Sequence, residues 1–344
     1  MLDLEKLLLL GKELHFVGIG ALEAREVHEL VPVLQKRAEE KRKTPFEEQV
    51  ISSRVNPFLL MKCAKSIIVT ATSYADESSS FMENKPLFAG ELARFARGLD
   101  YHQVVHQQLK ALAEKLNRDE PDLEWRAFVD TGPLVDRYLA AQAGIGVYGK
   151  NNCLIIPGTG SYVVLGYLII NKPVQDSVAE PQRLQSCDGC GQCQKSCPSN
   201  ALEVPYQVRP DRCLSCLLQQ KENIPQAMRT LMGQRVYGCD ICQAVCPHNQ
   251  QAAQTKEPMM FHIPRSPWID LVHLLTLSNR GFNRLYRSSA FGWRGHRIMQ
   301  RNALMALGNA NDKEAVKHIK PFTHHQREEL GDMARWALRQ HMQS

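Results

Sequence analysis

The order of apolar and polar residues predicts a mixed unit of helices and strands in the first half of the chain. The β-branched run over 66–72 has the pattern of a buried strand. The segments 3–14 and 88–117 repeat apolar residues at helical spacing. We expect helices over 3–14, 23–43, 88–117 and 133–143, a short apolar segment over 16–20, and strands over 66–72, 124–129, 153–156 and 161–170.

The second half of the chain has a different pattern. Residues 173–181 are polar and are typical of a linker, and residues 187–247 hold nine of the eleven cysteines, interrupted by glycines and prolines. From Trp268 onward the pattern is helical. Residues 301–309 and 333–338 resemble helices of HEAT-type repeats. Two such segments are too few for a solenoid, so we expect them to pack on the rest of the protein.

Charge is unevenly distributed along the 344 residues, which carry a formal net charge of +6. Between Asp270 and Asp312 there is no acidic residue. The arginines of this stretch are Arg280, Arg284, Arg287, Arg294, Arg297 and Arg301. They account for the whole net charge, and such a stretch suggests an anionic partner.

No segment reaches the roughly 18 apolar residues that a membrane span needs. The apolar run over 7–10 follows Asp3 and Glu5 instead of a basic region, so it does not resemble a signal peptide. We therefore expect a cytoplasmic protein without membrane contact. Eleven cysteines in a reducing compartment indicate metal or redox chemistry instead of disulfides.

The spacing of the cysteines is the most specific signal in the sequence. The first run is Cys187-x2-Cys190-x2-Cys193-x3-Cys197-Pro198, and the second is Cys239-x2-Cys242-x3-Cys246-Pro247. The first run is that of bacterial two-cluster ferredoxins, in which the fourth cysteine binds the other cluster. Zinc sites are the alternative, but two endings of the form C-x3-C-P are not zinc-knuckle spacing. The sequence thus predicts two [4Fe–4S] clusters.

The ferredoxin pattern also predicts which cysteines bind which cluster. One cluster is expected on Cys187, Cys190, Cys193 and Cys246. The other is expected on Cys197, Cys239, Cys242 and a fourth thiolate, because the second run is one cysteine short. Either Cys213 or Cys216 supplies that ligand. Cys63 and Cys153 stand alone in apolar contexts, and we expect them to be small buried residues.

Several stretches resemble the epoxyqueuosine reductases, nearly from end to end. These are residues 54–57 (R-V-N-P), 93–102 (A-R-F-A-R-G-L-D-Y-H), 129–133 (V-D-T-G-P), 143–151 (A-G-I-G-V-Y-G-K-N), 160–162 and 165–166, followed by the two cysteine runs and the arginine-rich tail. The resemblance implies a cobalamin that faces one cluster and has no protein histidine on cobalt. It also implies Cys213 as the eighth cluster ligand, with Cys216 as a departure from the family.

The resemblance further implies roles for single residues. Asp130 matches the family's catalytic aspartate, close to the cofactor, and would donate the proton to the departing alkoxide. The alternative is that Asp130 caps the helix expected after Pro133. Asp136 is the nearby rival for this role but is expected on the helix surface, and His102 is expected on a helix surface or in a pocket. Cobalamin contacts are expected from Asp130 itself and from Arg54, Lys150, Ser161 and Ser215.

The function that follows from the resemblance is the reduction of epoxyqueuosine, at the wobble position of tRNA, to queuosine. Electrons would come from an unidentified low-potential donor. We expect Arg284, Arg287, Arg294 and Arg297 to contact the anticodon stem-loop, and Tyr286, Phe291 and Trp293 to stack on bases. A basic helical face with aromatic core residues is the alternative. Competing functions are a reductive dehalogenase-like corrinoid enzyme and a non-enzymatic ferredoxin-type electron carrier.

Together these patterns predict an α+β protein of three domains that acts as a monomer. Residues 1–176 would form an α/β domain that binds cobalamin and substrate. Residues 177–262 would form a ferredoxin-like domain with two [4Fe–4S] clusters. Residues 263–344 would form a basic α-helical, HEAT-like segment.

Overall fold

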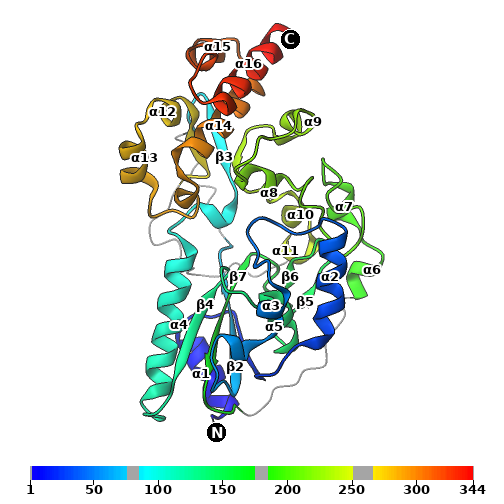
Figure 1. Cartoon of the computed structure of the whole chain (residues 1–344), viewed down its shortest axis with the longest axis vertical. Helices are drawn as coiled ribbons and strands as arrows, with labels where there is room; N and C mark the ends of the chain where they lie inside the picture. The colour runs from blue at the N-terminus through cyan, green and yellow to red at the C-terminus, as the bar shows by residue number, and fades with distance from the viewer. Residues whose placement is uncertain (1, 76–84, 175–184, 251–265, 344) are drawn as a thin grey trace.

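The computed structural model describes residues 2–75, 85–174, 185–250 and 266–343. In Figure 1 the half of the molecule that contains the N-terminus is built around a sheet, and the half that contains the C-terminus is helical. The ends of the predicted domains, at 176/177 and 262/263, and most of the predicted linker over 173–181 lie outside the described residues.

The larger sheet has four strands in the order β1-β2-β7-β4. Its strands are β1 (Gly18–Glu23), β2 (Ser66–Ser73), β7 (Val163–Ile170) and β4 (Trp125–Val129). All three pairings are antiparallel, whereas an alternating α/β unit carries parallel strands. This part of the chain is therefore better described as α+β.

The strand predicted over 66–72 is confirmed, and its unbroken apolar run has a simple reason. Ile67, Val69 and Ala71 face α5 (Asp136–Gln142) on one side of the sheet. On the other side, Ile68 belongs to the core formed with α4 (Tyr101–Asn117) and α1 (Leu4–Glu13). Side chains on both faces of this strand are buried. A polar residue on either face would lose its contact with water, so both faces carry mostly apolar residues.

Two predicted helices are shorter than expected. The helix expected over 88–117 begins only at Tyr101, where the Asp100 side chain accepts a hydrogen bond from the backbone N–H of His102 and caps it. The residues before it form β3 (Ala89–Leu92). The helix expected over 23–43 is reduced to α2 (Val31–Glu39). Residues 268–270, expected to be helical, form β9 (Trp268–Asp270).

A second sheet joins three distant segments of the chain. Its order is β8-β3-β9, where β3 pairs in parallel with β8 (Arg235–Tyr237) and antiparallel with β9. One strand from the N-terminal part thus forms backbone hydrogen bonds with the cysteine-rich segment and with the start of the helical tail. Figure 1 shows β3 reaching up from the sheet half into the helical half.

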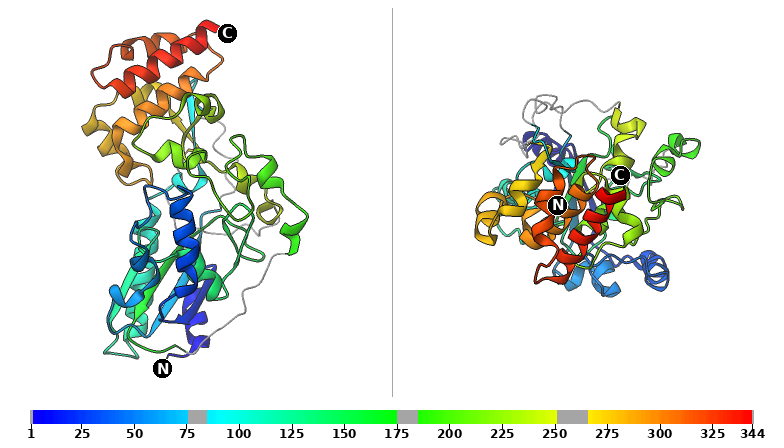
Figure 2. Two further views of the ribbon diagram at one scale, coloured as in Figure 1. Left: turned by 45° about the vertical axis from the view of Figure 1, so that its right-hand side comes forward. Right: turned by 90° about the horizontal axis from the view of Figure 1, so that it is seen from above.

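The helical half is organised around α14 (Gly295–Gly308), most of whose residues are buried. It packs against α16 (Glu328–Gln343), α12 (Leu271–Thr276) and β8. The two HEAT-like stretches predicted from the sequence lie in α14 and α16, and they pack on each other and on the cysteine-rich segment. In the left view of Figure 2 that segment (green) projects from the side of the molecule between the sheet and the C-terminal helices.

The remaining elements are short. They are η1 (His28–Leu30), α3 (Ile51–Val55), η2 (Pro57–Leu59), η4 (Arg94–Ala96), β5 (Val147–Tyr148), β6 (Leu154–Ile155), α6 (Gln185–Asp188), α7 (Gln192–Lys195), α8 (Leu214–Gln219), α9 (Gln226–Arg229), η5 (Thr230–Met232), α10 (Ile241–Ala244), α11 (Pro247–Gln250), α13 (Asn279–Tyr286), η7 (Gly292–Arg294), α15 (Ala315–Ile319) and η8 (Lys320–Phe322). Within the described ranges, every helix is too short or too polar to cross a bilayer.

Candidate active site and cluster-binding segment

The thiols of the cysteine-rich segment lie in two groups, and the first contains Cys187, Cys190, Cys193 and Cys246. Burial raises the pKa of Cys193, and the nearby thiolates of Cys246 and Cys187 raise it further. Burial likewise raises the pKa of Cys246, with added contributions from Cys187 and Cys190. The chain therefore brings the last cysteine of the second run back to the first run, as in two-cluster ferredoxins.

The second group contains Cys197, Cys213, Cys239 and Cys242. Burial raises the pKa of Cys239 to about 11, and the charge of Cys213 adds to the rise. The pKa of Cys213 is also raised by burial and, less, by the charge of Cys197. Cys242 lies within electrostatic reach of Cys213 and Cys239. The sulfur of Cys197 accepts a hydrogen bond of 3.3 Å from the backbone N–H of Ala201.

Cys216 has different surroundings from Cys213, although it lies only one turn away on α8. Burial raises the pKa of Cys216 to about 12, and Cys213 is the cysteine whose charge adds most to this rise. The other charges that act on it come from the carboxylates of Asp211, Glu222 and Glu47. Apart from Cys213, the charged neighbours of Cys216 are therefore carboxylates, while those of Cys213 are further cysteines.

The donor set fits two cubane clusters. All eleven cysteines are free thiols, and the turn before α7 is made by Gly191, whose φ of +68° places it in the left-handed region that glycine adopts without strain. Cys187, Cys190 and Cys193 lie close together in sequence around this turn. In the described residues, no three His, Cys, Asp or Glu side chains approach closely enough to hold a single metal ion.

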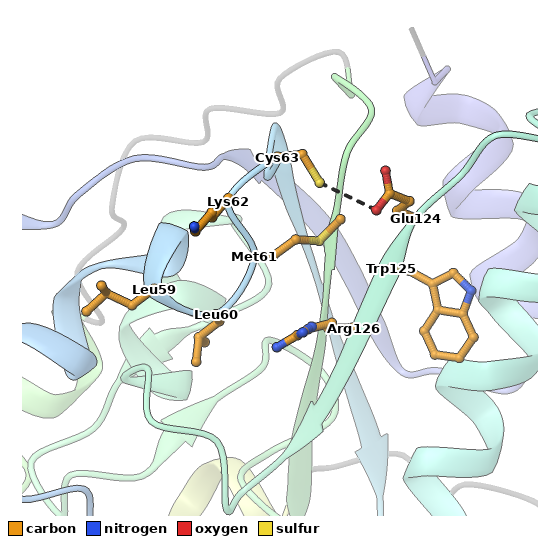
Figure 3. A pocket seen from close by; sticks show the side chains of 8 residues that line it. All are labelled: Leu59, Leu60, Met61, Lys62, Cys63, Glu124, Trp125 and Arg126. Atoms are coloured by element: carbon orange, nitrogen blue, oxygen red, sulfur yellow. Dashed lines mark hydrogen bonds between the residues drawn. The ribbon is translucent and has the colours of Figure 1, made fainter.

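The two isolated cysteines differ from each other. Cys153 is half-buried and hydrogen-bonded to Cys242, so it is a fifth thiol beside the second group. The prediction that Cys63 is buried was wrong, because it is exposed. Figure 3 shows its sulfur directed at the carboxylate of Glu124, 3.8 Å away, in a pocket of about 440 Å³. This pocket lies at the end of the sheet where the strands β2 and β4 begin.

Asp130 lies at the opposite end of the sheet, directly after the last residue of β4. Its backbone conformation is unusual. Its φ of +53° is rare for a residue other than glycine, and its carboxylate is 61% exposed. The hydroxyl of Tyr101 donates a hydrogen bond of 2.5 Å to that carboxylate. The N-cap of α5 is Val135, which makes no side-chain capping bond. The alternative role of Asp130 as a helix cap is therefore wrong.

Tyr101 is a functional candidate that the sequence reasoning passed over, and it lies beside His102, which was expected on a helix surface or in a pocket. The Nε2 atom of His102 lies 3.8 Å from Asp130, and its Nδ1 atom lies 2.7 Å from the carboxylate of Asp100. The His102 ring stacks on Tyr101 with centroids 4.1 Å apart. The signal was present in the sequence, because residues 93–102 belong to the stretches that resemble the family. Asp130, the most exposed of these groups, thus lies between Tyr101 and His102, and Asp100 lies on the other side of His102.

Asp136 was expected on the helix surface, and the structure corrects this. Burial raises the pKa of Asp136 to about 8, and the charge of Asp130 adds to the rise. Its Oδ1 atom is buried and has no hydrogen-bond partner among the described residues, and the same holds for the Nε atoms of Arg37 and Arg54. The charge of Arg54 acts on both Asp136 and Arg37, so the three residues lie in one region. Each of them has one buried polar atom without a partner in the described part of the chain.

The four predicted cobalamin contacts other than Asp130 have different surroundings. Arg54 forms an ion pair with Glu47, which also pairs with Arg37 at 3.0 Å. Lys150 donates a hydrogen bond of 2.9 Å to the backbone carbonyl of Asp188, in the first cysteine run.

The two predicted serine contacts are held by protein groups. Ser161 is buried, and its hydroxyl accepts hydrogen bonds from the side chains of Asn249 and Gln243. These contacts join the start of β7 to the second cysteine run. Ser215 lies in α8, where the Gln219 side chain donates to its carbonyl and hydroxyl oxygens.

The arginines of the acid-free stretch are not equivalent. Arg284 and Arg287 are exposed, and neither forms an ion pair with a described residue. Arg294 lies over the ring of Trp293, 4.4 Å from its centroid. Arg297 pairs with Glu329 at 2.9 Å. Arg301, by contrast, is fully buried.

The three aromatic residues proposed to stack on bases are also not equivalent. Phe291 is 1% exposed and belongs to the core, and Tyr286 packs against it with ring centroids 5.2 Å apart. Only Trp293, 54% exposed, offers a large free surface. The prediction of base stacking by Phe291 was therefore wrong, because its ring fills the helical core.

Comparison with known proteins decides the family. Residues 54–131 match the family model "Epoxyqueuosine reductase QueG, DUF1730", and residues 186–249 match "4Fe-4S double cluster binding domain". The epoxyqueuosine reductase of Lactococcus garvieae is 33% identical over 97% of this chain and 95% of its own length. The chain belongs to the epoxyqueuosine reductase family. It is thus an oxidoreductase with a segment for two [4Fe–4S] clusters.

Solved structures agree with this assignment. An epoxyqueuosine reductase crystallised with an epoxyqueuosine-modified stem loop of tRNA-Tyr is 33% identical, with a TM-score of 0.89 over 98% of this chain and 89% of that one. The enzyme of Bacillus subtilis, solved with its catalytic aspartate loop swung out of the active site, is 32% identical, with a TM-score of 0.88 over 98% and 89%. The fold is therefore that of the family along nearly the whole chain.

Proposed function

We propose that this chain reduces epoxyqueuosine at the wobble position of tRNA to queuosine with a cobalamin and two [4Fe–4S] clusters. The observation that carries the proposal is the hydrogen bond of 2.5 Å from Tyr101 to the exposed carboxylate of Asp130. The Tyr101 ring packs against Phe95, which packs against Tyr237, two residues before Cys239. The candidate acid is therefore connected by packed side chains to the second cysteine group.

Removal of the epoxide oxygen as water takes two electrons and two protons. Asp130 is suited to give a proton to that oxygen, because it combines exposure with a fixed carboxylate. Tyr101 orients the carboxylate through its hydrogen bond, and the Nε2 atom of His102 lies 3.8 Å from it. A bound cobalamin would supply the low-potential reductant at the epoxide carbon, with electrons that the clusters deliver one at a time from an unidentified donor.

We assign one cluster to Cys187, Cys190, Cys193 and Cys246, and the other to Cys197, Cys213, Cys239 and Cys242. The mutual electrostatic effects within each group support this division. The acidic neighbours of Cys216 support Cys213 as the eighth ligand, since carboxylates close to a thiolate disfavour its charge.

A cobalamin fits the polar region beside Asp130. Its edge carries amide side chains, which need hydrogen-bond partners when they are buried. The unpaired buried atoms of Arg37, Arg54 and Asp136 are available for such bonds. Of the other predicted contacts, Lys150 and Ser215 remain proposals, while the hydrogen bonds of Ser161 to Asn249 and Gln243 favour a packing role.

For the tRNA, we propose contacts to phosphates from Arg284, Arg287, Arg294 and Arg297. The relative crystallised with a modified stem loop supports an anticodon stem-loop as the partner. The exposed arginines would provide affinity that depends on salt and not on sequence. Every group in the proposal comes from one chain, so we expect a monomer.

The Asp130→Asn variant tests the catalytic role. We expect it to keep about eight irons per chain and to retain cobalamin, but to lose about a hundredfold or more in turnover, because acid catalysis contributes roughly 10²–10⁴. Turnover is measured as the ratio of queuosine to epoxyqueuosine in digested tRNA. Glu124→Gln is the matched control, since Glu124 lies at the other end of β4 in the pocket of Figure 3 and should not affect turnover.

Full activity of Asp130→Asn would contradict the assignment of Asp130.

A separate measurement distinguishes this function from a ferredoxin-type carrier. Reconstituted protein is incubated with cobalamin, desalted without oxygen and examined by optical spectroscopy. We expect a retained corrinoid band beside the cluster absorbance, and a spectrum with clusters alone would favour simple electron transfer.

A further inference from the structure

Two exposed aromatic rings meet where the N-terminal part of the chain touches the helical tail. Phe46 lies between α2 and α3, and Trp293 lies in η7. Their ring centroids are 6.1 Å apart in an edge-to-face arrangement. Phe46 is 40% exposed and Trp293 is 54% exposed. We call this pair, with Arg294, the Phe46–Trp293 platform.

A hydrogen bond to a buried tyrosine fixes the orientation of the platform. The indole N–H of Trp293 donates a hydrogen bond of 2.9 Å to the hydroxyl of Tyr237, whose own hydrogen goes to the carbonyl of Ala290 at 3.0 Å. Tyr237 is 1% exposed. An exposed indole whose orientation is fixed by a buried hydrogen bond loses little further freedom when a ligand stacks on it.

Arg294 completes the platform with an unsatisfied charge. Its guanidinium lies 4.4 Å from the ring centroid of Trp293 and 5.4 Å from that of Phe46. Its Nε atom is buried without a hydrogen-bond partner among the described residues, and no described carboxylate pairs with it. A guanidinium that is stacked on aromatic rings but unpaired is suited to a planar, anionic ligand.

The platform is connected to the candidate active site. Tyr101, which binds Asp130, packs against Phe95 with ring centroids 6.2 Å apart, and Phe95 packs against Tyr237 at 5.8 Å. Tyr237 in turn binds Trp293. The platform and the candidate acid are therefore joined by a continuous series of packed side chains.

A nucleotide fits these features best. Each unpaired base has a flat π surface, and stacking on an aromatic side chain contributes about 1–3 kcal/mol per base. Each nucleotide also brings a phosphate, and the stretch from 271 to 311 has six arginines and no acidic residue. The exposed Arg284 and Arg287 lie in that stretch. An acidic protein partner would match the charge, but it would not explain why an exposed indole ring is held in a fixed orientation.

We propose that the Phe46–Trp293 platform stacks one unpaired anticodon-loop base that flanks the modified nucleotide. This inference rests on the proposed function, because the modified base is taken to lie at Asp130. It adds a binding site for a second, unmodified base. Its role would be to fix the loop in the splayed conformation that exposes the target.

The test compares Trp293→Ala with Trp293→Phe in protein loaded with both clusters. The probe is an anticodon stem-loop RNA of a substrate tRNA, and Kd is measured by fluorescence anisotropy. We expect Trp293→Ala to raise Kd about tenfold or more, since a tenfold change corresponds to about 1.4 kcal/mol. Trp293→Phe keeps a ring for stacking and should stay within about threefold of the wild type.

Stem-loops with a single abasic position identify the base. One abasic position next to the wobble nucleotide should weaken binding to the wild type but add little to the effect of Trp293→Ala, because both changes remove the same contact. Phe46→Leu, which removes a ring from the other side, should weaken binding less. Leu285→Ala is the control, since Leu285 is also 40% exposed and lies on the basic helix α13.

Unchanged binding by Trp293→Ala, or additive effects at every abasic position, would overturn the inference. If Trp293→Ala loses iron because its hydrogen bond to Tyr237 in the cluster-binding segment is gone, Phe46→Leu decides. Failure of the proposed function looks different, since the wild-type protein would then leave epoxyqueuosine in tRNA unreduced. An active wild type whose binding does not depend on Phe46 and Trp293 would refute the platform alone.

Discussion

The arginines of α13 and α14 come from one stretch of sequence and have opposite surroundings. Arg284 and Arg287, at the end of α13, are exposed and form no ion pair with a described residue. Arg301, in the middle of α14, is 0% exposed. Its guanidinium donates to the backbone carbonyls of Leu217, Leu218, Gln220 and Glu222 and to the side chain of Asn302.

The difference teaches that a run of like charges can serve two purposes. The carbonyls bound by Arg301 belong to the end of α8 and the residues after it, where a helix leaves its last carbonyls without partners. Burial lowers the pKa of Arg301 to about 10, so it remains charged at neutral pH. Since α8 starts directly after Cys213, Arg301 holds the cluster-binding segment on the tail, while the arginines of α13 face water.

The largest effect is expected from Arg301→Met. It would leave several buried carbonyls without donors, and the free energy of unfolding should fall by about 3 kcal/mol or more. Iron per chain should fall as well, because α8 positions Cys213. Arg301→Lys keeps the charge but has fewer donors, so it should be intermediate. Iron analysis and thermal unfolding measure both effects, and full iron with unchanged Tm would show that the buried arginine is dispensable.

An intermediate effect is expected on the exposed side of the comparison. The double variant Arg284→Gln/Arg287→Gln should keep its iron and Tm but bind the stem-loop roughly tenfold more weakly at low salt. The slope of log Kd against log salt should fall by about one to two, since two phosphate contacts are lost. The matched control is Lys36→Gln/Lys110→Gln, two exposed lysines on the sheet half. Equal weakening by the control would mean that only net charge matters.

The smallest effect on stability is expected from Arg297→Ala, on the same helix as Arg301. Its ion pair with Glu329 is partly exposed on both sides, and such pairs contribute about 0–1 kcal/mol. Denaturant unfolding should therefore show almost no change, while stem-loop binding should weaken slightly if Arg297 reaches a phosphate. A loss of stability close to that of Arg301→Met would contradict the distinction between the buried Arg301 and the exposed arginines.

Much of the site could be predicted because it depends on short-range order. The two cysteine runs set which thiols come from one loop, and the family model over 186–249 confirms the double-cluster segment. The strand over 66–72 followed from an apolar run that is buried on both faces. The strand over 124–129 mixes apolar and charged residues and lies at the edge of the sheet. Asp130 could be selected because it ends such a strand inside a stretch that resembles the family.

Other features could not be predicted, because they depend on which distant segments meet. Residues 89–92 continue a helical pattern, yet they form β3 because β8 and β9 supply hydrogen-bond partners from elsewhere in the chain. Cys63 looked buried from its apolar neighbours but lies in an open pocket. The exposure of Phe46 beside Trp293 joins residues far apart in sequence. No local pattern carries that information.

The sequence alone determined the chemistry that this protein has available: the thiolates in ferredoxin spacing, the aspartate after a strand and the acid-free run of arginines. Tertiary structure alone decided how each group is used. It buried Arg301 on carbonyls and exposed Arg284, it surrounded Cys213 with thiols and Cys216 with carboxylates, and it placed Tyr101 on Asp130. The physical reason is that burial and charge are properties of the whole neighbourhood in space, and most of that neighbourhood comes from other parts of the chain.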